Sequence, residues 1–145
     1  MRIFLDTNVL FAAVVHSHPN HHASNAVLQR VQDGRDQGFI AAHSLAELYS
    51  VLTRIPPPTR HSPEQALATI HENVLEFFKV FALSAADYTT LIRESALAGI
   101  RGGTIYDAIL IKCAVKAEVE RIYTANLRHF QTVAPADMTS RIFSP

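Results

Sequence analysis

The stretch Ile3-Phe4-Leu5-Asp6-Thr7-Asn8 determines how the rest of the chain is interpreted. Its first three residues form a short, continuous apolar run, which is typical of a strand buried on both faces. Three polar residues then end the run, and a small apolar segment follows them. A strand of this kind belongs in a sheet that is covered on both sides.

Beyond this stretch, short apolar runs alternate with segments whose apolar residues recur at helical spacing. Strands are predicted over residues 39–42, 80–83 and 121–124, with Val133 beginning another. Helices are predicted over residues 21–37, with Gly34 and Gly38 at its fraying end, and over 44–54, 62–78, 84–97 and 105–119. Such alternation predicts an α/β fold with a mainly parallel sheet, arranged as a three-layer α/β/α sandwich.

Length and composition predict one domain that spans residues 1–145. The 48% hydrophobic and 18% charged residues are typical of a soluble globular protein. The 13 basic and 13 acidic residues balance, which argues against a strongly basic protein that coats nucleic acid. The single cysteine, Cys113, is predicted to be buried and fits a reducing compartment. No apolar stretch is long enough for a membrane span, so we expect a cytoplasmic protein.

Four polar residues fall at or near predicted strand-to-helix junctions: Asp6, Glu47, Asp107 and Asn126. In a parallel sheet such junctions share one edge, where ligands bind. Carboxylates gathered at that edge would repel one another, and a divalent cation would remove the repulsion. Because all the candidate ligands are oxygen donors, they suit Mg²⁺ or Mn²⁺ better than zinc.

Helix capping is the alternative explanation of the same residues. Ser44-x-x-Glu47 and Thr104-x-x-Asp107 both match a capping box, and Asp6 or Asn126 could be an N-cap. Against capping, both Glu47 and Asp107 interrupt apolar helix surfaces with no Lys or Arg close in sequence.

Four segments resemble, in order, the motifs of PIN-domain nucleases, and of VapC-type toxins in particular: Phe4–Leu10, Ser44–Arg54, Ile105–Leu110 and Thr124–Phe130. The resemblance covers nearly the whole chain. It implies an Mg²⁺- or Mn²⁺-dependent endoribonuclease that is usually dimeric. It also implies the role of toxin in a type II toxin-antitoxin pair, with an antitoxin protein as partner.

Matched to these motifs, Asp6, Glu47 and Asp107 are the implied catalytic and metal-binding acids. Asn126 occupies a fourth catalytic position that is often Asp in the family, which leaves open whether one metal binds or two. Thr7 and Thr104 are candidates for supporting the ligands, with helix capping as the alternative. The candidates for contacting an RNA backbone are Arg54, Arg101, Lys112 and Arg128, which are otherwise solvated surface residues.

Other interpretations remain at this stage. A catalytically silent PIN-like module that binds RNA or a partner protein is the strongest alternative function, because Asn126 replaces an acid. A phosphoaspartyl phosphatase would need Asp in place of Asn8.

The run of histidines at positions 16, 18, 21 and 22 matches no strong zinc pattern and is predicted to be exposed. The apolar stripe of Leu67, Ile70, Val74 and Phe77 is predicted to be core, with a dimer or antitoxin groove as the alternative.

Overall fold

A single five-stranded sheet forms the centre of the computed structural model, which describes all 145 residues. The strand order is β3-β2-β1-β4-β5, and every neighbouring pair is parallel. The sheet is therefore entirely parallel, and β1 lies at its centre. The strands are β1 (Arg2–Leu5), β2 (Gln37–Ala41), β3 (Phe78–Phe81), β4 (Arg121–Tyr123) and β5 (Ile142–Phe143).

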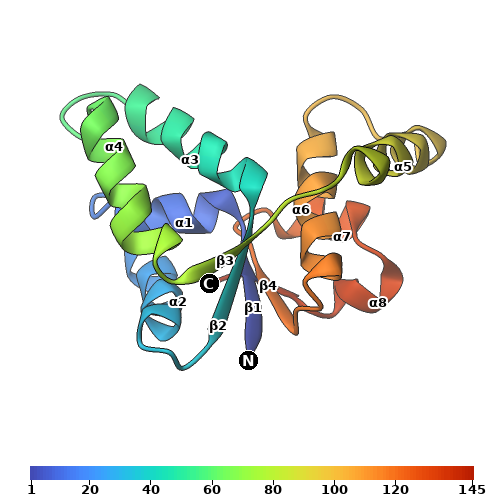
Figure 1. Cartoon of the computed structure of the whole chain (residues 1–145), viewed down its shortest axis with the longest axis horizontal. Coiled ribbons are helices and arrows are strands. Elements are labelled where there is room, and N and C mark those ends of the chain that lie inside the picture. Colours follow the sequence, from blue (N-terminus) through green and yellow to red (C-terminus); the bar gives the residue numbers. More distant parts are fainter.

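Helices cover both faces of the sheet, which confirms the predicted three-layer α/β/α architecture. Helices α1 to α4 lie on one side of it and α5 to α8 on the other (Figure 1). None of these helices is long and apolar enough to cross a membrane. Their bounds are α1 (Thr7–Val14), α2 (His21–Gln32), α3 (Ala42–Arg54), α4 (Pro63–Ile70), the π-helix η1 (His71–Leu75), α5 (Ala85–Leu97), α6 (Thr104–Lys116), α7 (Leu127–Val133) and α8 (Ala136–Thr139).

The central strand is buried on both faces, as its apolar run predicts. Ile3 and Leu5 belong to the hydrophobic cluster that includes residues of α1, α2 and α3. Phe4 belongs to a second cluster with residues of α6 and α7, and all three side chains are fully buried. Because successive side chains of a strand point to opposite faces, this short run anchors both helical layers.

The order of the strands fixes where a ligand can bind. From β1 the chain adds β2 and then β3 on one side, and it later returns to place β4 on the other side of β1. In open α/β sheets, ligands bind at the carboxyl ends of the strands where the order reverses in this way. Here that point lies between the ends of β1 and β4.

Several predicted boundaries are wrong. α2 ends at Gln32, and Gly38 lies within β2, where a Cβ atom would come within 2.6 Å of the Phe78 and Val31 side chains. α3 begins at Ala42 rather than Ser44. Val133 ends α7 instead of starting a strand.

The apolar stripe after residue 63 is only partly core. Ile70 and Val74 are buried, whereas Leu67 is 63% exposed and Phe77 is 39% exposed. α4 buries Ala66 and Ile70, and Leu67 lies about 100° from Ala66 around the helix axis. At His71 the helix widens into η1, which changes the direction of the residues that follow.

Candidate active site

Asp6 is a buried carboxylate at the end of the central strand. It directly follows β1, and the residue is only 5% exposed. Its Oδ2 accepts a hydrogen bond of 2.7 Å from the hydroxyl of Thr124, which directly follows β4. This hydrogen bond joins the carboxyl ends of the two strands between which the strand order reverses.

Burial and neighbouring negative charge together raise the pKa of Asp6 to about 7. Burial has the larger effect, and the carboxylates of Asp107 and Glu47 add to it. The hydrogen bonds from the Thr124 hydroxyl and the Thr7 backbone favour the ionised form, but they do not offset these effects. The protein therefore holds a carboxylate where its charge is disfavoured.

Glu47 lies in the second turn of α3 and reaches back toward the end of β1. Its Oε2 accepts a hydrogen bond of 2.9 Å from the hydroxyl of Thr7, the first residue of α1. The same oxygen lies 3.6 Å from Nε2 of His43. The Glu47 side chain is 43% exposed, so it keeps the freedom to rotate.

Asp107 lies in the first turn of α6, and this helix covers the opposite side of the sheet from α3 (Figure 1). Burial raises the pKa of its carboxyl, the neighbouring imidazole of His129 lowers it, and the Glu47 carboxylate raises it. Nδ1 of His129 lies 3.7 Å from Oδ2 of Asp107.

All four candidate residues line one cleft: Asp6, Glu47, Asp107 and Asn126. Thr7, Asn8, Phe11, Val51, Tyr106 and Leu110 complete its lining. No Lys or Arg is among these residues, so no basic side chain within the cleft compensates the three carboxylates.

Capping does not explain these residues. Asp6 and Asn126 occupy N-cap positions, but neither side chain makes a capping hydrogen bond. The α3 helix begins two residues before Ser44, and α6 is preceded by Gly103, which has no side chain to cap it. The alternative explanation of Glu47 and Asp107 by capping boxes is therefore wrong.

Thr124 and Asn8 support the site, although the sequence did not single them out. The Thr124 hydroxyl donates to Asp6 and accepts a hydrogen bond of 3.0 Å from the backbone N–H of Asn126. Oδ1 of Asn8 accepts one of 3.1 Å from the backbone N–H of Ala125. The contacts of Thr124 with Asp6 and of Asn8 with Ala125 join residues more than 100 positions apart. The only local signal for Thr124 is a hydroxyl directly after an apolar strand.

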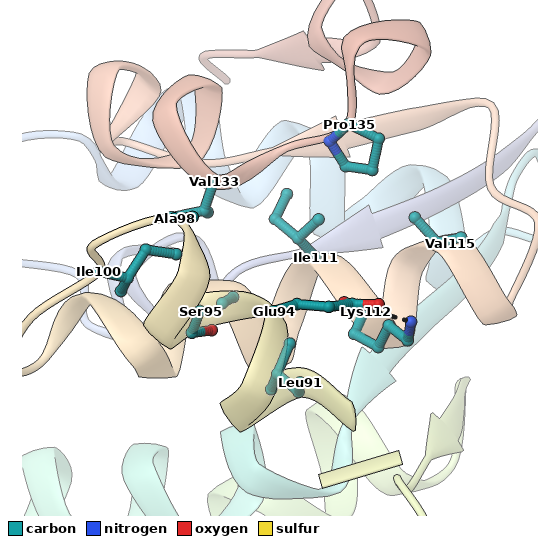
Figure 2. A pocket seen from close by; sticks show the side chains of 11 residues that line it. Leu91, Glu94, Ser95, Ala98, Ile100, Ile111, Lys112, Val115, Val133 and Pro135 are labelled. Atoms are coloured by element: carbon teal, nitrogen blue, oxygen red, sulfur yellow. Dashed lines mark ion pairs between the residues drawn. The ribbon is translucent and has the colours of Figure 1, made fainter. Parts of the chain in front are cut away.

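Several of the other predicted residues do not reach the cleft. Thr104 begins α6 without lining the cleft, and Arg101 is exposed in the loop before it. Lys112 lines a separate, mainly apolar pocket formed by α5, α6 and residues at the end of α7 (Figure 2). Its Nζ lies 4.0 Å from Oε2 of Glu94. That pocket holds a balanced ion pair and no cluster of acids.

The donor chemistry of the cleft fits a hard divalent cation. The side chains of Asp6, Glu47 and Asp107 offer only oxygen, which Mg²⁺ and Mn²⁺ prefer. As placed in this structure, no group of three or more His, Cys, Asp or Glu side chains surrounds a point that could hold a metal ion. The same finding applies to the run of histidines, of which His16 and His22 are exposed.

Two solved structures share the fold of this chain. VapC20 of Mycobacterium tuberculosis, described as a toxin that cleaves the sarcin-ricin loop, aligns with a TM-score of 0.63 and 16% identity over 83% of this chain and 86% of its own. VapBC2 of Rickettsia felis, bound to a DNA fragment from the promoter, aligns with a TM-score of 0.65 and 18% identity over 100% of this chain and 99% of its own.

Sequence comparison identifies the family. Residues 3–134 match the PIN domain. Ribonuclease VapC40 of M. tuberculosis is 34% identical over 127 residues, which cover 88% of each chain. Ribonuclease VapC27 of the same organism is 32% identical over 116 residues, which cover 80% of this chain and 79% of the relative. The chain therefore belongs to the PIN-domain family and, within it, to the VapC-type ribonucleases.

Proposed function

We propose that this protein is an endoribonuclease that hydrolyses RNA phosphodiester bonds with Mg²⁺ or Mn²⁺ held by Asp6, Glu47 and Asp107. One observation carries the proposal: three carboxylates line one cleft that no Lys or Arg lines, and the most buried of them has a pKa of about 7. Repulsion and burial make this arrangement costly unless a cation binds. Membership of a ribonuclease family supplies the reaction.

The residues of the chain hold the acids in place. Thr124 fixes the Asp6 carboxylate, and Thr7 holds Glu47 close to the same strand end. A bound divalent cation polarises the phosphate and makes water a stronger nucleophile. Asn126 is uncharged, and its side-chain oxygen is suited to ligate weakly or to orient a water molecule. We therefore favour one tightly held cation over two.

The proposed biological role follows from the relatives. Two of them are named as ribonucleases of the VapC type, and the R. felis structure contains a VapB together with its VapC. We propose by analogy that this chain is the toxin of a type II toxin-antitoxin pair, that it forms a homodimer, and that an antitoxin protein inhibits it.

Cleavage of an RNA panel tests the activity. The panel includes structured RNAs such as tRNAs, and each is incubated with Mg²⁺, with Mn²⁺ and with EDTA. We expect cleavage with a cation, none in EDTA, and none by Asp6→Asn in either condition. Cleavage that persists in EDTA would refute the role of the metal. RNA binding without cleavage under every condition would favour the silent module.

Thermal unfolding tests the metal site without relying on activity. Saturating Mg²⁺ should stabilise the wild type by mass action, about 2.7 kcal/mol at a hundredfold excess over the dissociation constant. Asp107→Asn should gain much less, and in EDTA it should be as stable as the wild type or more so, because it relieves repulsion. An equal response of both proteins to Mg²⁺ would exclude Asp107 as a ligand.

A further inference from the structure

An exposed aromatic pair stands at the rim of the acidic cleft. The rings of His43 and Tyr106 are stacked, with centroids 5.2 Å apart and planes 8° from parallel. His43 comes from the first turn of α3 and Tyr106 from the first turn of α6, so the pair joins the two helical layers beside the cleft. Tyr106 itself lines the cleft together with the acids.

Core packing does not account for this pair. Neither ring belongs to any of the three hydrophobic clusters. Tyr106 is 52% exposed, whereas the His43 side chain is 28% exposed, so His43 is the inner ring and Tyr106 the outer one. Nε2 of His43 also lies 3.6 Å from the Glu47 carboxylate, which places the inner ring between the acid and the tyrosine.

The charge of the cleft limits how it can hold RNA. Three carboxylates and no Lys or Arg line it, so phosphates gain no attraction there from basic side chains. The whole chain carries no net charge that could compensate. A protein that binds nucleic acid without many ionic contacts must obtain affinity from other contacts, and stacking of an unpaired base on an aromatic ring contributes about 1–3 kcal/mol.

We propose that the outer face of Tyr106 is a platform on which an unpaired RNA base next to the cleaved phosphate stacks, with His43 supporting the ring from behind. The inference rests on the proposed ribonuclease function and names a substrate class, which is RNA with an unstacked nucleotide at the cleavage site. Tyr106 positions the substrate, and it contributes no proton to the reaction.

Binding of single-stranded RNA oligonucleotides tests the platform without depending on cleavage. Affinity is measured by fluorescence anisotropy with Mg²⁺ in the Asp6→Asn protein, which keeps Tyr106, and in the same protein with Tyr106→Phe or Tyr106→Leu added. We expect the Tyr106→Phe protein, which keeps the aromatic face, to bind RNA with an affinity within about twofold. The Tyr106→Leu protein should bind about tenfold more weakly. Tyr88→Leu is the matched control, because Tyr88 is 38% exposed on α5 and does not line the cleft.

An abasic scan distinguishes base stacking from a general loss of fit. Removing the base at one position of the oligonucleotide should weaken binding by Tyr106 but add no further loss in Tyr106→Leu, as expected for two partners in one contact. In the otherwise wild-type enzyme, Tyr106→Leu should raise KM about tenfold and leave kcat within about twofold. Unchanged thermal unfolding of the variant confirms its fold.

The outcomes separate this inference from the proposed function. If RNA is bound and shows the Tyr106 effect but is never cleaved, the platform stands and the ribonuclease proposal fails. If RNA is cleaved and Tyr106→Leu binds it as Tyr106 does, the platform is refuted. The platform is also refuted if Tyr106→Leu loses the same affinity for intact and for abasic RNA. It is refuted too if Tyr106 serves only to bind a partner protein.

Discussion

At the scale of single residues, two threonine hydroxyls orient the acids: Thr7 donates to Glu47 and Thr124 to Asp6. Thr124→Val keeps the shape of the side chain but removes the donor. We expect cleavage activity or metal affinity to fall about tenfold to a hundredfold, as is typical when a group that orients a metal ligand is lost. Steady-state cleavage over a range of Mg²⁺ concentrations measures both effects.

Thr124→Ser is the matched control, because it keeps the hydroxyl that donates to Asp6. Its activity should lie close to that of the wild type. If Thr124→Val matched the wild type while Asp6→Asn was inactive, the hydrogen bond between Thr124 and Asp6 would have no role in catalysis.

The raised pKa of Asp6 makes stability in EDTA depend on pH. The folded pKa is about 7 against an ordinary value of 3.8, so folding favours the protonated form. The contribution of Asp6 to the free energy of unfolding is fully favourable below about pH 4 and is lost as the pH rises through 7. Its loss lowers the free energy of unfolding by at most about 4 kcal/mol.

Urea unfolding in EDTA at pH 5 and pH 8 measures this dependence. The wild type should lose more stability between these values than Asp6→Asn, which cannot ionise. Saturating Mg²⁺ should reduce the difference, because a cation favours the ionised carboxylate. Parallel pH profiles in EDTA for the two proteins would contradict the raised pKa.

At the scale of elements, α5 shows how a helix is fixed locally. Ser84 and Asp87 form a reciprocal capping box, and Asp87 also accepts a hydrogen bond of 2.6 Å from Lys116 of α6. That lysine and the capping hydrogen bonds lower the pKa of Asp87 to about 2. The contacts therefore join α5 to the helix that carries Asp107.

Ser84→Ala removes this cap and should reduce the free energy of unfolding by about 1 kcal/mol. RNA cleavage by the folded protein should not change, because α5 contributes no residue to the acidic cleft. Ser62→Ala is a matched comparison, since Ser62 and Gln65 form the same box on α4. Chemical denaturation and the RNA assay test both variants, and a loss of activity without a loss of stability would contradict this view.

The same helix starts show what sequence can and cannot predict. The pattern Ser84-x-x-Asp87 forms a capping box, whereas the matching patterns at Ser44 and Thr104 do not. α3 follows β2 without a break, so Ser44 already lies inside the helix, and Thr104 is the first residue of α6. A four-residue pattern carries no information on where the preceding segment ends.

Tertiary contacts explain the remaining differences. The alternation of strands and helices predicts the α/β class and the layers, because each element has its own periodicity. The strand near the carboxyl end is β5, at Ile142–Phe143, and it is too short to give a signal of its own. The hydrogen bond from Thr124 to Asp6 depends on which strands become neighbours, and local patterns do not specify that.

At the scale of the whole molecule, the amino terminus is held by a buried acid. The α-amino group of Met1 lies 2.9 Å from Oδ1 of Asp36, and the Arg30 guanidinium lies 2.6 Å from Oδ2. The Asp36 side chain is only 3% exposed. These ion pairs fix the start of β1 beside the start of β2, on which the whole sheet is built.

Asp36→Asn should reduce the free energy of unfolding by about 1–3 kcal/mol, because two cationic groups lose a buried partner. Asp33→Asn is the control: Asp33 pairs with Arg35 where both side chains are more than half exposed, so we expect a change below about 0.5 kcal/mol. Urea unfolding measures both. If Asp36→Asn and Asp33→Asn changed the free energy of unfolding equally, the ion pair between Asp36 and the amino terminus would add no stability.

The position of β1 between β2 and β4 also determines when the enzyme becomes active during its own synthesis. Asp6 and Thr124 are 118 residues apart, and the central strand gains its second neighbour only with residues 121–123. A nascent chain, or a fragment released early from the ribosome, therefore lacks both the partner that orients Asp6 and the residue Asn126. The proposed capacity to cleave RNA therefore arises in one step, only after residues 121–126 have been made and have joined the sheet.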